Sequence, residues 1–517
     1  MFVLTPCGPS ALMALKKVTT TIIFFDLITA RLPIIHDSPC HKYLFLLLLF
    51  TIFISLSCLT SLAAARCHVD DETGLLDFKS GIKTDPSRML SSWIKGTDCC
   101  KWFGITCSTS NRVTTLTLVG RPNNLTQSLS GTISPSLSKL MLMHSIFLQD
   151  LKNLEGPFPY FLLNLPNIQY VYIENNKLSG PIPINISKMV HLSSLSLEGN
   201  RFSGPIPSSI GELTQLTQLR LGLNLLTGTI PNSIQRLKNL TLLHLDHNQI
   251  SGTIPEIFSG FSNLRTLNFG YNKLTGKIPS GISSLAPLLA FLELGHNFLS
   301  GPIPDFLGKF QTLDTLDLSW NNFSGIVPKT FANLTKIFNL DLSHNLLVDP
   351  FPEMNVKGIE SLDLSYNKFH LGTIPRWVTT STIIYSLKLA KCGIKMKLDD
   401  WKPTDTYFYD YIDLSENEIT GSAVTLLNRT DYLVGFYASG NKLKFDLGKL
   451  RIVKSLKDLD LSKNLVVGNV PKGVTGLEKL NVSYNHLCGK IPSTKFEASV
   501  FVGNDCLCGS PLPNCKV

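Results

Sequence analysis

The sequence has little charge and few of the motifs that catalysis needs. Only 16% of its 517 residues are charged, and 47 Lys and Arg against 38 Asp and Glu give a net charge of +9. These cations are spread along the chain, whereas nucleic-acid binding needs a clustered basic stripe. The sequence also lacks a glycine-rich phosphate loop, a zinc-type C-x-x-C pair, an H-E-x-x-H motif and a nucleophile beside a base. We therefore expect no enzyme, no metal or cofactor site and no nucleic-acid partner.

The first 65 residues are predicted to form a leader. Residues 44–65 carry no charge, follow Lys42 and end at Ala63-Ala64-Ala65, which is typical of a signal core with its cleavage site. The same 22 residues would suffice for an uncleaved anchor, since a helix rises ~1.5 Å per residue and the hydrocarbon core is ~30 Å thick. The 42 residues before this apolar segment are unusually many for a signal peptide. An uncleaved anchor, or a start codon assigned too far upstream, would explain them. A cleaved signal peptide and an uncleaved anchor would both place the rest of the chain outside the cytosol. We favour cleavage after Ala65, which leaves a mature chain with a net charge of +7.

Cysteines and glycosylation sequons indicate an oxidising compartment outside the cytosol. Beyond the leader lie nine cysteines, four near each end and Cys392 alone between them, and the spacing leaves three pairings open within each group of four. The two groups are Cys67, Cys99, Cys100 and Cys107, and Cys488, Cys506, Cys508 and Cys515. Seven N-x-S/T sequons start at Asn124, Asn185, Asn239, Asn322, Asn333, Asn428 and Asn481.

Between the cysteine groups the sequence repeats the unit L-x-L-x-x-N-x-L-x-G-x-I-P. Thirteen steps of its Asn position cover 309 residues, a mean of 23.8, which lies within the range of leucine-rich repeats. Degenerate units before these, one starting at Leu116 and one with Lys152 in place of Asn, raise the expected number to about sixteen. The ladder positions are Asn176, Asn200, Asn224, Asn248, Asn272, Asn297, Asn321, Asn345, Asn367, Cys392, Asn417, Asn441, Asn464 and Asn485.

Each letter of the unit has a physical reason. Leu219 and Leu221 flank Arg220 in the period-2 pattern of a short strand with one buried face. One unit cannot bury that face alone, so neighbouring units must stack with parallel strands into one array. The Asn amide satisfies buried backbone groups, and the Gly before Ile-Pro permits a tight turn. We expect Cys392 to replace one Asn as a buried reduced thiol.

Both ends of the array resemble known caps. The segment from Asp71 to Cys107, with Leu75-Leu76-Asp77-Phe78-Lys79, Leu90-Ser91-Ser92-Trp93 and Gly104-Ile105-Thr106-Cys107, resembles the N-terminal cap of plant extracellular leucine-rich repeat proteins. The tail from Leu487 to Cys515 is similar to the C-terminal cap of polygalacturonase-inhibiting proteins and related proteins without a kinase domain. The resemblance implies the disulfides Cys67–Cys99, Cys100–Cys107, Cys488–Cys506 and Cys508–Cys515. It also implies an α/β solenoid, a right-handed superhelix whose parallel concave sheet binds proteins or peptides.

The predicted organisation has four parts. These are the leader (1–65), an N-terminal cap (66–110), the leucine-rich repeat array (111–487) and a C-terminal cysteine cap (488–517). The sequence departs from polygalacturonase-inhibiting proteins, which usually have about ten repeats, because its array is longer. It also loses the full G-x-I-P pattern between Lys395 and Leu456, where Trp401, Tyr407, Phe408, Tyr409 and Tyr411 stand. That segment is expected to be a run of imperfect repeats, with a bend or a lid as the alternative.

Exposed positions of neighbouring strands are expected to form rows on the concave face, because such strands lie ~4.8 Å apart. The middle row passes Arg220 and then becomes a run of Asp, which is either family consensus or a strip for a basic ligand. A second row, just before the Asn ladder, reads His247, Tyr271, His296, Trp320, His344 and Tyr366, and aromatic side chains of this kind are favoured at interfaces. The predicted binding patch is Arg220, His244, His247, Tyr271, Glu293, His296, Asp317 and Trp320.

The histidines of these rows suggest two further expectations. His244, Asp246 and His247 are expected to be solvated strand positions rather than metal ligands. Because histidine has an unperturbed pKa of ~6.5, His244, His247, His296 and His344 would gain charge in a mildly acid wall and strengthen the binding of an acidic partner.

The function expected from these patterns is recognition outside the cell. The first hypothesis is a secreted or cell-surface protein that binds a protein or peptide and works with membrane receptor kinases in plant defence or development. The alternative is an inhibitor of a microbial wall-degrading enzyme such as polygalacturonase. The positive charge also predicts weak pectin association that moderate salt would reverse. The expected location is the extracellular space or cell wall, or the membrane if residues 44–65 stay as an anchor.

Overall fold

The computed structural model describes residues 67–121, 129–404 and 408–515, which all belong to one compact unit from Arg66 to Val517. The predicted leader, Asn124 and Tyr407 lie outside the described residues. In the described ranges, no helix is both long enough and apolar enough to cross a membrane.

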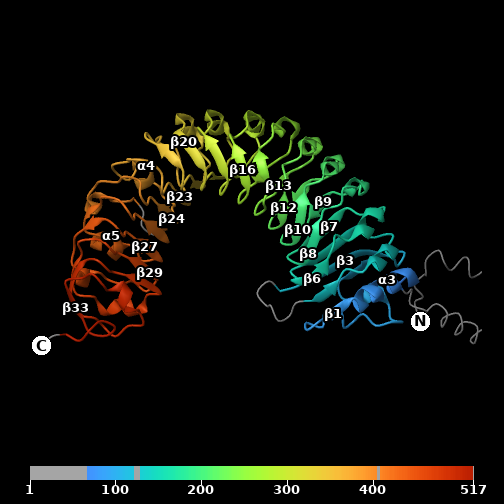
Figure 1. The fold of residues 1–517 in the computed structure, drawn as a ribbon, viewed down its shortest axis with the longest axis horizontal. Coiled ribbons are helices and arrows are strands. Elements are labelled where there is room, and N and C mark those ends of the chain that lie inside the picture. The colour runs from blue at the N-terminus through green and yellow to red at the C-terminus, as the bar shows by residue number, and fades with distance from the viewer. Residues whose placement is uncertain (1–66, 122–128, 405–407, 516–517) are drawn as a thin grey trace, which may run out of the picture. The chain divides into compact units, whose positions relative to one another are not determined.

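One long sheet lines the inner side of this curved unit (Figure 1). It starts with β2 (Ile105–Cys107), which pairs antiparallel with β3 (Val113–Val119), and all later pairings are parallel. The strands after β3 are β5 (Ser145–Gln149), β7 (Tyr170–Glu174), β9 (Ser194–Ser196), β11 (Gln218–Arg220), β13 (Leu242–His244), β15 (Thr266–Asn268), β17 (Phe291–Glu293), β19 (Thr315–Asp317), β21 (Asn339–Asp341), β23 (Ser361–Asp363), β24 (Ser386–Lys388), β25 (Tyr411–Asp413), β27 (Gly435–Tyr437), β29 (Asp458–Asp460) and β31 (Lys479–Asn481). With β3 they make sixteen parallel strands in the described residues, one for each predicted unit.

The alternating pattern places the strands as predicted. Leu219 and Leu221 are fully buried, whereas Arg220 between them is half-buried on the open face. The leucines of all the units join one continuous hydrophobic core along the array. Burial of each leucine contributes about 1.5 to 3 kcal/mol, so the core, shared between units, supplies the stability that a single unit lacks.

Gly, Ile and Pro of the repeat turn the chain back on the outer side. Gly204 has a φ of +77°. Ile206 is buried, and Pro207 adopts an extended conformation that starts the helix η6. The helices of the coils are η3 (Pro135–Lys139), η4 (Tyr160–Asn164), η5 (Ile186–Lys188), η6 (Ser208–Glu212), η7 (Asn232–Arg236), η8 (Phe258–Gly260), η9 (Ser280–Leu285), η10 (Asp305–Lys309), η11 (Lys329–Asn333), α4 (Arg376–Thr379), η12 (Leu398–Asp400), α5 (Val424–Arg429), η13 (Leu447–Lys449), η14 (Lys472–Gly476) and η15 (Ala498–Val500). Glycine at these turns is required because other residues reach positive φ only with strain.

Shorter sheets form along a second side of the coils, between the main sheet and the helices. Their strands are β4 (Ser130–Thr132), β6 (Asn153–Gly156), β8 (Lys177–Pro181), β10 (Arg201–Pro205), β12 (Leu225–Thr227), β14 (Ser251–Thr253), β16 (Lys273–Gly276), β18 (Phe298–Gly301), β20 (Asn322–Ile326), β22 (Leu346–Val348), β26 (Thr420–Gly421), β28 (Lys442–Leu443), β30 (Val467–Gly468), β32 (His486–Lys490) and β33 (Cys506–Cys508). Most of them pair in parallel with the same segment of the next coil.

The Asn ladder joins each coil to the one before it. The Asn272 amide nitrogen donates to Phe269 and Gly270 of its own coil at 3.2 and 3.1 Å, and to Leu245 of the previous coil at 2.9 Å. Its side-chain oxygen accepts the backbone N–H of Ile250 at 3.0 Å. The same pattern recurs along the ladder, so buried polar backbone groups are satisfied where the chain leaves each strand.

Two predictions about unusual ladder positions had different outcomes. Cys392 is buried and free of disulfides, as predicted, and its Sγ lies 3.4 Å from the Leu364 carbonyl oxygen. The assignment of Lys152 was partly confirmed, because its backbone N–H donates to the Asn175 carbonyl oxygen at 3.1 Å, as the Asn200 N–H does to Leu223. However, Gln149 pairs with Glu174 in register, so fully buried Leu151 is aligned with Asn176 and one residue is inserted here.

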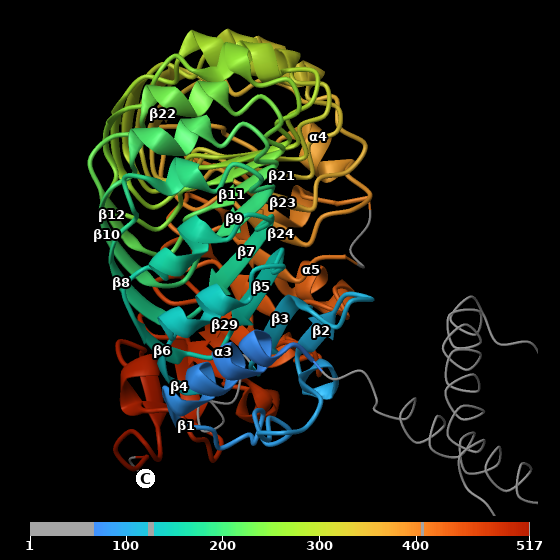
Figure 2. The same ribbon diagram turned by 90° about the vertical axis from the view of Figure 1, so that its right-hand side faces the viewer.

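The N-terminal cap packs a helix against the end of the array. Helix α3 (Val69–Ser80) lies at the blue end of the chain beside the first coils (Figure 2). Its fully buried Asp71 accepts two hydrogen bonds from the Arg112 guanidinium, each 2.9 Å, and one from the Val113 backbone N–H at 2.8 Å. Short elements β1 (Ile82–Thr84) and η1 (Cys99–Lys101) complete the cap. The disulfides here are Cys67–Cys99 and Cys100–Cys107.

The C-terminal cap continues the repeat geometry without its sequence pattern. Val482 and Tyr484 donate their backbone N–H groups to carbonyl oxygens of Val500 and Val502, at 3.0 and 2.8 Å. Asn504 acts as a further ladder residue, because its side-chain oxygen accepts from the Leu487 N–H at 3.0 Å. The disulfides here are Cys488–Cys506 and Cys508–Cys515. All four disulfides are those that the resemblance implies, and both ends of the solenoid are capped.

The irregular segment between Lys395 and Leu456 continues the array. β24, β25 and β27 pair in unbroken parallel register. Trp401 and Tyr409 are both buried and meet edge to face at 5.8 Å between ring centroids. Imperfect repeats therefore account for the segment, and its described residues form no lid over the concave face.

Candidate functional site on the concave face

The middle row of the concave face follows the predicted order. Strand pairing aligns Arg220 with His244, Glu293 with Asp317, and Asp317 with Asp341. The row then continues through Asp363, Lys388 and Asp413. Its early part is chemically mixed and its later part is acidic. We call Asp317, Asp341 and Asp363 the acid row.

A stack of aromatic and imidazole rings runs beside the acid row. We call it the aromatic ladder, and it consists of His247, Tyr271, His296, Trp320, His344 and Tyr366. Successive ring centroids lie 4.0, 3.9, 5.3, 3.7 and 4.5 Å apart, and every pair is stacked with nearly parallel planes. Stacking of this kind contributes about 0.5 to 1.5 kcal/mol per pair beyond area burial. Because neighbours cover the ring faces, the ladder presents mainly ring edges to solvent.

Backbone geometry sets the direction of the ladder. All six residues have a positive φ, between 49° for His247 and 56° for Tyr366. The same conformation recurs at Lys391, Glu416 and Lys463 in later coils, so it belongs to the repeat and not to the rings. Non-glycine residues adopt it at a cost of about 1 kcal/mol or more. Each coil therefore projects this side chain at the same angle, and six coils in succession place a ring there.

The acid row is oriented by serines that sequence analysis did not select. The side-chain oxygens of Asp317, Asp341 and Asp363 accept the backbone N–H two residues later, from Ser319, Ser343 and Ser365, at 2.8 to 2.9 Å. The Ser343 hydroxyl also donates to Asp341, at 2.6 Å. The signal was the recurrent D-L-S of the repeat. One oxygen of each Asp therefore has a structural role, as the family-consensus interpretation requires.

A glycine creates the space for one of these carboxylates. A Cβ atom on Gly295 would lie 2.6 Å from both carboxylate oxygens of Asp317. The carboxylate thus packs over the bare backbone of the preceding coil, and any larger residue at Gly295 would displace it.

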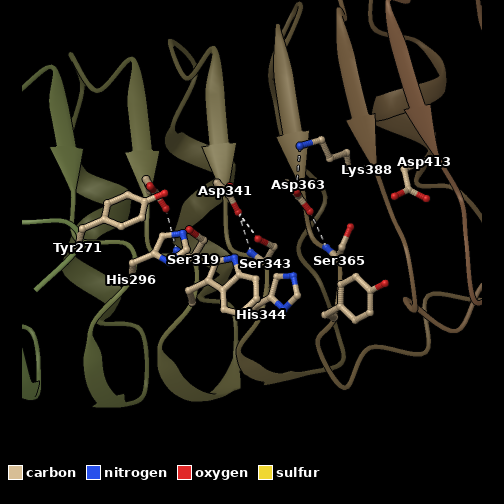
Figure 3. A pocket seen from close by; sticks show the side chains of 13 residues that line it. Tyr271, His296, Ser319, Asp341, Ser343, His344, Asp363, Ser365, Lys388 and Asp413 are labelled. Atoms are coloured by element: carbon tan, nitrogen blue, oxygen red, sulfur yellow. Dashed lines mark hydrogen bonds and ion pairs between the residues drawn. The ribbon is translucent and has the colours of Figure 1, made fainter. Parts of the chain in front are cut away.

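The acid row and the ladder enclose a concavity of about 380 Å³ (Figure 3). Its lining comprises Tyr271, His296, Asp317, Ser319, Trp320, Asp341, Ser343, His344, Asp363, Ser365, Tyr366, Lys388 and Asp413. Figure 3 shows the carboxylates at the strand ends and the rings below them, with the Lys388 amino group directed at Asp363.

Burial perturbs several ionisable groups in this region. Burial, reinforced by the neighbouring Asp363 carboxylate, raises the pKa of Asp341 to about 7. Burial also raises the pKa of Asp413 and lowers the pKa of His244, His296 and His344. These three histidines therefore gain charge at lower pH than free histidine does. The shift opposes the expected histidine switch in a mildly acid wall.

The structure brings only half of the predicted patch to the concavity. Tyr271, His296, Asp317 and Trp320 line it. Arg220, His244 and His247 lie on earlier coils of the same face, whereas Glu293 shares the coil of His296 but is not part of the lining. The Arg220 Nε and His244 Nε2 atoms are buried and have no hydrogen-bond partner in the described residues. The predicted patch and the lining therefore overlap in four residues, and the lining also contains His344, Tyr366 and later Asp residues that the patch did not include.

The remaining sequence candidates lie as follows. His247 Nδ1 contacts the Asp246 carboxylate at 3.0 Å, and the described residues form no histidine and carboxylate cluster that could hold a metal ion. The sequon residues Asn185, Asn239, Asn322 and Asn333 are exposed, whereas Asn428 and Asn481 are half-buried. Asn481 belongs to the concave row, where it accepts hydrogen bonds from Ser483.

Family profiles match several stretches of the chain. A profile described as leucine rich repeat N-terminal domain matches residues 68–108. Leucine rich repeat profiles match residues 239–299 and 287–347, and also residues 167–189, 191–213 and 476–494.

Individual relatives and solved structures are similar to parts of the chain. Polygalacturonase inhibitor 2 of Arabidopsis thaliana is 41% identical over 113 residues, which cover 20% of this chain and 34% of the relative. Polygalacturonase inhibitor 1 of Phaseolus vulgaris is 37% identical over 112 residues, or 20% and 33%. The chain thus spans about a third of the length of these curated relatives. The Arabidopsis receptor kinase HAESA, solved with the peptide hormone IDA and the co-receptor SERK1, has a similar fold, with a TM-score of 0.52 and 24% identity over 85% of this chain and 98% of that one.

Proposed function

The chain is a leucine-rich repeat protein, and from that premise we propose that it is an extracellular recognition module that binds a protein or peptide on its concave face. The proposed setting is plant defence or developmental signalling, together with membrane receptor kinases. The HAESA complex supports this setting, because that receptor kinase has a similar fold and was solved with a peptide hormone and a co-receptor.

The aromatic ladder is the observation that carries this proposal. Tyr271 and Trp320 expose 46% and 49% of their surface, although each could be replaced by a small polar residue without loss of the leucine core. Exposed Trp and Tyr beside a concavity are typical of binding surfaces, because they supply large, rigid contact area. No described segment of the chain covers them, so a partner is the natural source of their burial.

Capture of partners from plant membranes tests the proposal. The full chain would be produced in plant cells, purified, immobilised and incubated with solubilised membranes, and bound proteins would be identified by mass spectrometry. We expect receptor kinases among them. The double variant Tyr271→Ser and Trp320→Ser should retain at least tenfold less of the same proteins, since it removes the ladder's largest exposed rings.

A matched control separates the concave face from general stickiness. Tyr160 and Phe298 are 49% and 56% exposed and lie on other surfaces, in η4 and β18. The double variant Tyr160→Ser and Phe298→Ser should retain the partners as the unchanged chain does. Equal capture by all three proteins would contradict a binding site on the concave face.

Inhibition of a wall-degrading enzyme is the second candidate. The observation in its favour is the 41% identity to polygalacturonase inhibitor 2 over 113 residues. A panel of fungal polygalacturonases, assayed with purified protein, should then include one enzyme that loses activity. If every enzyme in a broad panel keeps full activity at micromolar protein, this candidate is excluded.

The proposed location is the cell wall or extracellular space, with membrane anchoring through residues 44–65 as the alternative. The four disulfides and the exposed sequons support an oxidising compartment. Fractionation of tissue distinguishes the alternatives. Release from walls by moderate salt supports secretion with weak pectin association, whereas a requirement for detergent supports the anchor.

A further inference from the structure

The concavity is acidic on a chain that is basic as a whole. The sequence carries a net charge of +9, yet the lining contains four Asp against one Lys. Within the described residues, Asp317 and Asp341 form no ion pair, and each keeps one carboxylate oxygen that no hydrogen bond uses. A ligand of complementary charge would therefore find carboxylates here that the protein itself leaves without a cation.

The arrangement of these carboxylates does not suit a metal ion. A metal site needs several ligand atoms that converge on one point. In the described residues the carboxylates of the acid row do not converge, since the one group of three ligand atoms within 4.8 Å of one another consists of disulfide-bonded cysteines. The acid row instead spreads over three coils, with neighbouring strands ~4.8 Å apart. Its geometry fits an elongated organic cation.

Two lysines of the chain already show how such a cation is held. The Lys388 amino nitrogen lies 3.6 Å from an Asp363 carboxylate oxygen. The Lys391 amino nitrogen lies 5.9 Å from the centroid of the Tyr366 ring and covers the C-terminal end of the ladder. Together they occupy the C-terminal end of the concavity with one carboxylate contact and one cation–π contact. Toward the N-terminus, the acid row and the aromatic ladder continue to Asp317 and Trp320. In the described residues no lysine pairs with this part of the concavity.

We propose that the concavity binds a basic protein segment in extended conformation, whose lysine or arginine side chains pair with Asp317 and Asp341 while their stems pack on the edges of the Trp320 and His344 rings. This inference rests on the proposed function and names the chemistry of its partner. Side chains at positions i and i+2 of an extended segment point to one face about 6.6 Å apart. Two such cations can therefore reach neighbouring members of the acid row.

Trp320 is a built-in reporter of this site. All five tryptophans of the chain lie in described residues, and Trp93, Trp102, Trp377 and Trp401 are each at most 6% exposed, against 49% for Trp320. External quenchers of tryptophan fluorescence will therefore act mainly on Trp320. The variant Trp320→Phe supplies the background from the four buried rings.

The test uses the full chain and two blocked peptides, Gly-Lys-Gly-Lys-Gly and its glutamine counterpart. Binding is measured at pH 7.5 as protection of Trp320 fluorescence from acrylamide. We expect the lysine peptide to reach half-saturation at a concentration at least tenfold lower than the glutamine peptide. The double variant Asp317→Asn and Asp341→Asn should remove at least five-sixths of this difference in half-saturation concentration between the two peptides. We also expect caesium ions to quench Trp320 more strongly than iodide, despite the net positive charge of the chain.

A charge-matched control excludes a general electrostatic effect. Glu212 and Asp431 are exposed away from the concavity, and the double variant Glu212→Gln and Asp431→Asn changes the net charge by the same amount. It should bind the lysine peptide as the unchanged chain does. Equal protection by the two peptides, or an unchanged lysine preference in the acid-row variant with normal circular dichroism, overturns the inference. If membrane partners still depend on Tyr271 and Trp320 in that event, the proposed function stands without a basic partner.

Discussion

At the scale of single residues, a few buried polar groups determine which coils fit together. Each ladder Asn satisfies several backbone groups at once, and each acid-row Asp is tied to its own backbone. Both kinds of residue look alike in sequence, as recurrent polar letters between leucines. Their substitutions nevertheless have different consequences, because the ladder is enclosed by backbone and the acid row faces a concavity.

Replacing Asn272 by Ala should destabilise the array. The variant leaves the Ile250 N–H and the Leu245 carbonyl without their side-chain partner in a buried position. We expect a loss of about 2 to 4 kcal/mol, since each unsatisfied buried group costs about 1 to 3 kcal/mol. Urea denaturation followed by circular dichroism measures it. The exposed Asn263→Ala variant of the same coil should stay within about 0.5 kcal/mol, and a similar effect of both substitutions would contradict the ladder's role.

Replacing Asp341 by Asn should change how stability depends on pH. The raised pKa of about 7 means that the folded chain binds this proton more tightly than the unfolded chain, in which the Asp side chain has its ordinary pKa of 3.8. Asp341 therefore favours folding below about pH 4, and this contribution is lost as pH rises to about 7. The asparagine variant lacks this loss. It should match the unchanged chain at pH 4 and exceed its stability by about 2 kcal/mol at pH 7.5, less than the full shift implies because the site is open to water.

Urea midpoints at pH 4, 5.5 and 7.5 measure this effect. The exposed variant Asp431→Asn serves as the control and should give no such pH-dependent gain. A constant difference between the Asp341→Asn variant and the unchanged chain at all three pH values would refute the raised pKa.

Sequence identified most ladder positions because they recur with a nearly fixed period. It did not reveal that one residue is inserted before Lys152, where strand register aligns Leu151 with Asn176 although the Lys152 N–H makes the bond of a ladder residue. It also missed Asn504, which lies in the cap where no repeat letters guide the alignment. The order of the ladder rings was predictable from the residue before each Asn. Their close stacking was not, since it depends on ring orientation in neighbouring coils.

At the scale of elements, the N-terminal helix depends on one buried ion pair. The Asp71→Asn variant keeps the shape of the side chain but leaves the Arg112 guanidinium without a counter-charge, and Arg112 is itself only 21% exposed. We expect α3 to lose about 2 to 4 kcal/mol of local stability. Hydrogen exchange of residues 69–80 measures this loss directly. The neighbouring Asp70→Asn variant, whose side chain is 63% exposed, should exchange as the unchanged chain does, and equal exchange in both variants would contradict the prediction.

The irregular coils show where the prediction of secondary-structure elements from the amino-acid sequence becomes uncertain. The strand residues Ile412 and Leu414 keep the alternation and are fully buried, so the strand itself is predictable. The returning part of the coil lost its G-x-I-P pattern, and large aromatics took its place. Trp401 and Tyr409 fill the core there, which decides for imperfect repeats over a lid, and that outcome depends on packing that sequence does not reveal.

At the scale of the whole molecule, both ends of the sheet need covers. A chain that stops after Asn485 would leave the Val482 and Tyr484 N–H groups without the carbonyl oxygens of residues 500 and 502. Such an open edge favours pairing with another chain. We expect this truncated chain to form larger, concentration-dependent species in size-exclusion chromatography. The Cys508→Ser and Cys515→Ser double variant keeps residues 500 and 502 in place and should elute as the unchanged chain does. Identical elution of all three proteins would disprove the role of the cap.

The fold of the array was predictable from sequence to the level of individual strands, whereas the site was predictable only in part. Period and burial follow from local letters, and sixteen strands appear for about sixteen predicted units. The concavity depends on which exposed side chains converge over several coils. The serines that orient the acid row recur in D-L-S, but their hydrogen bonds to the Asp carboxylates, and the contact of Lys388 with Asp363, appear only in the folded chain.

The one-residue insertion at Lys152 has a consequence for how such a gene can change through inheritance. Ladder bonds link a coil only to its immediate predecessor, so duplication or deletion of one complete coil leaves every surviving donor matched with an acceptor. Insertion of a single codon does not keep every donor matched with an acceptor. Beside Lys152, for example, the Asn176 side-chain oxygen is buried without a hydrogen-bond partner in the described residues. Heritable length variation is therefore expected in steps of about two dozen codons, and duplication of a coil such as that of Asp317 and Trp320 would lengthen the acid row and the aromatic ladder by one position each.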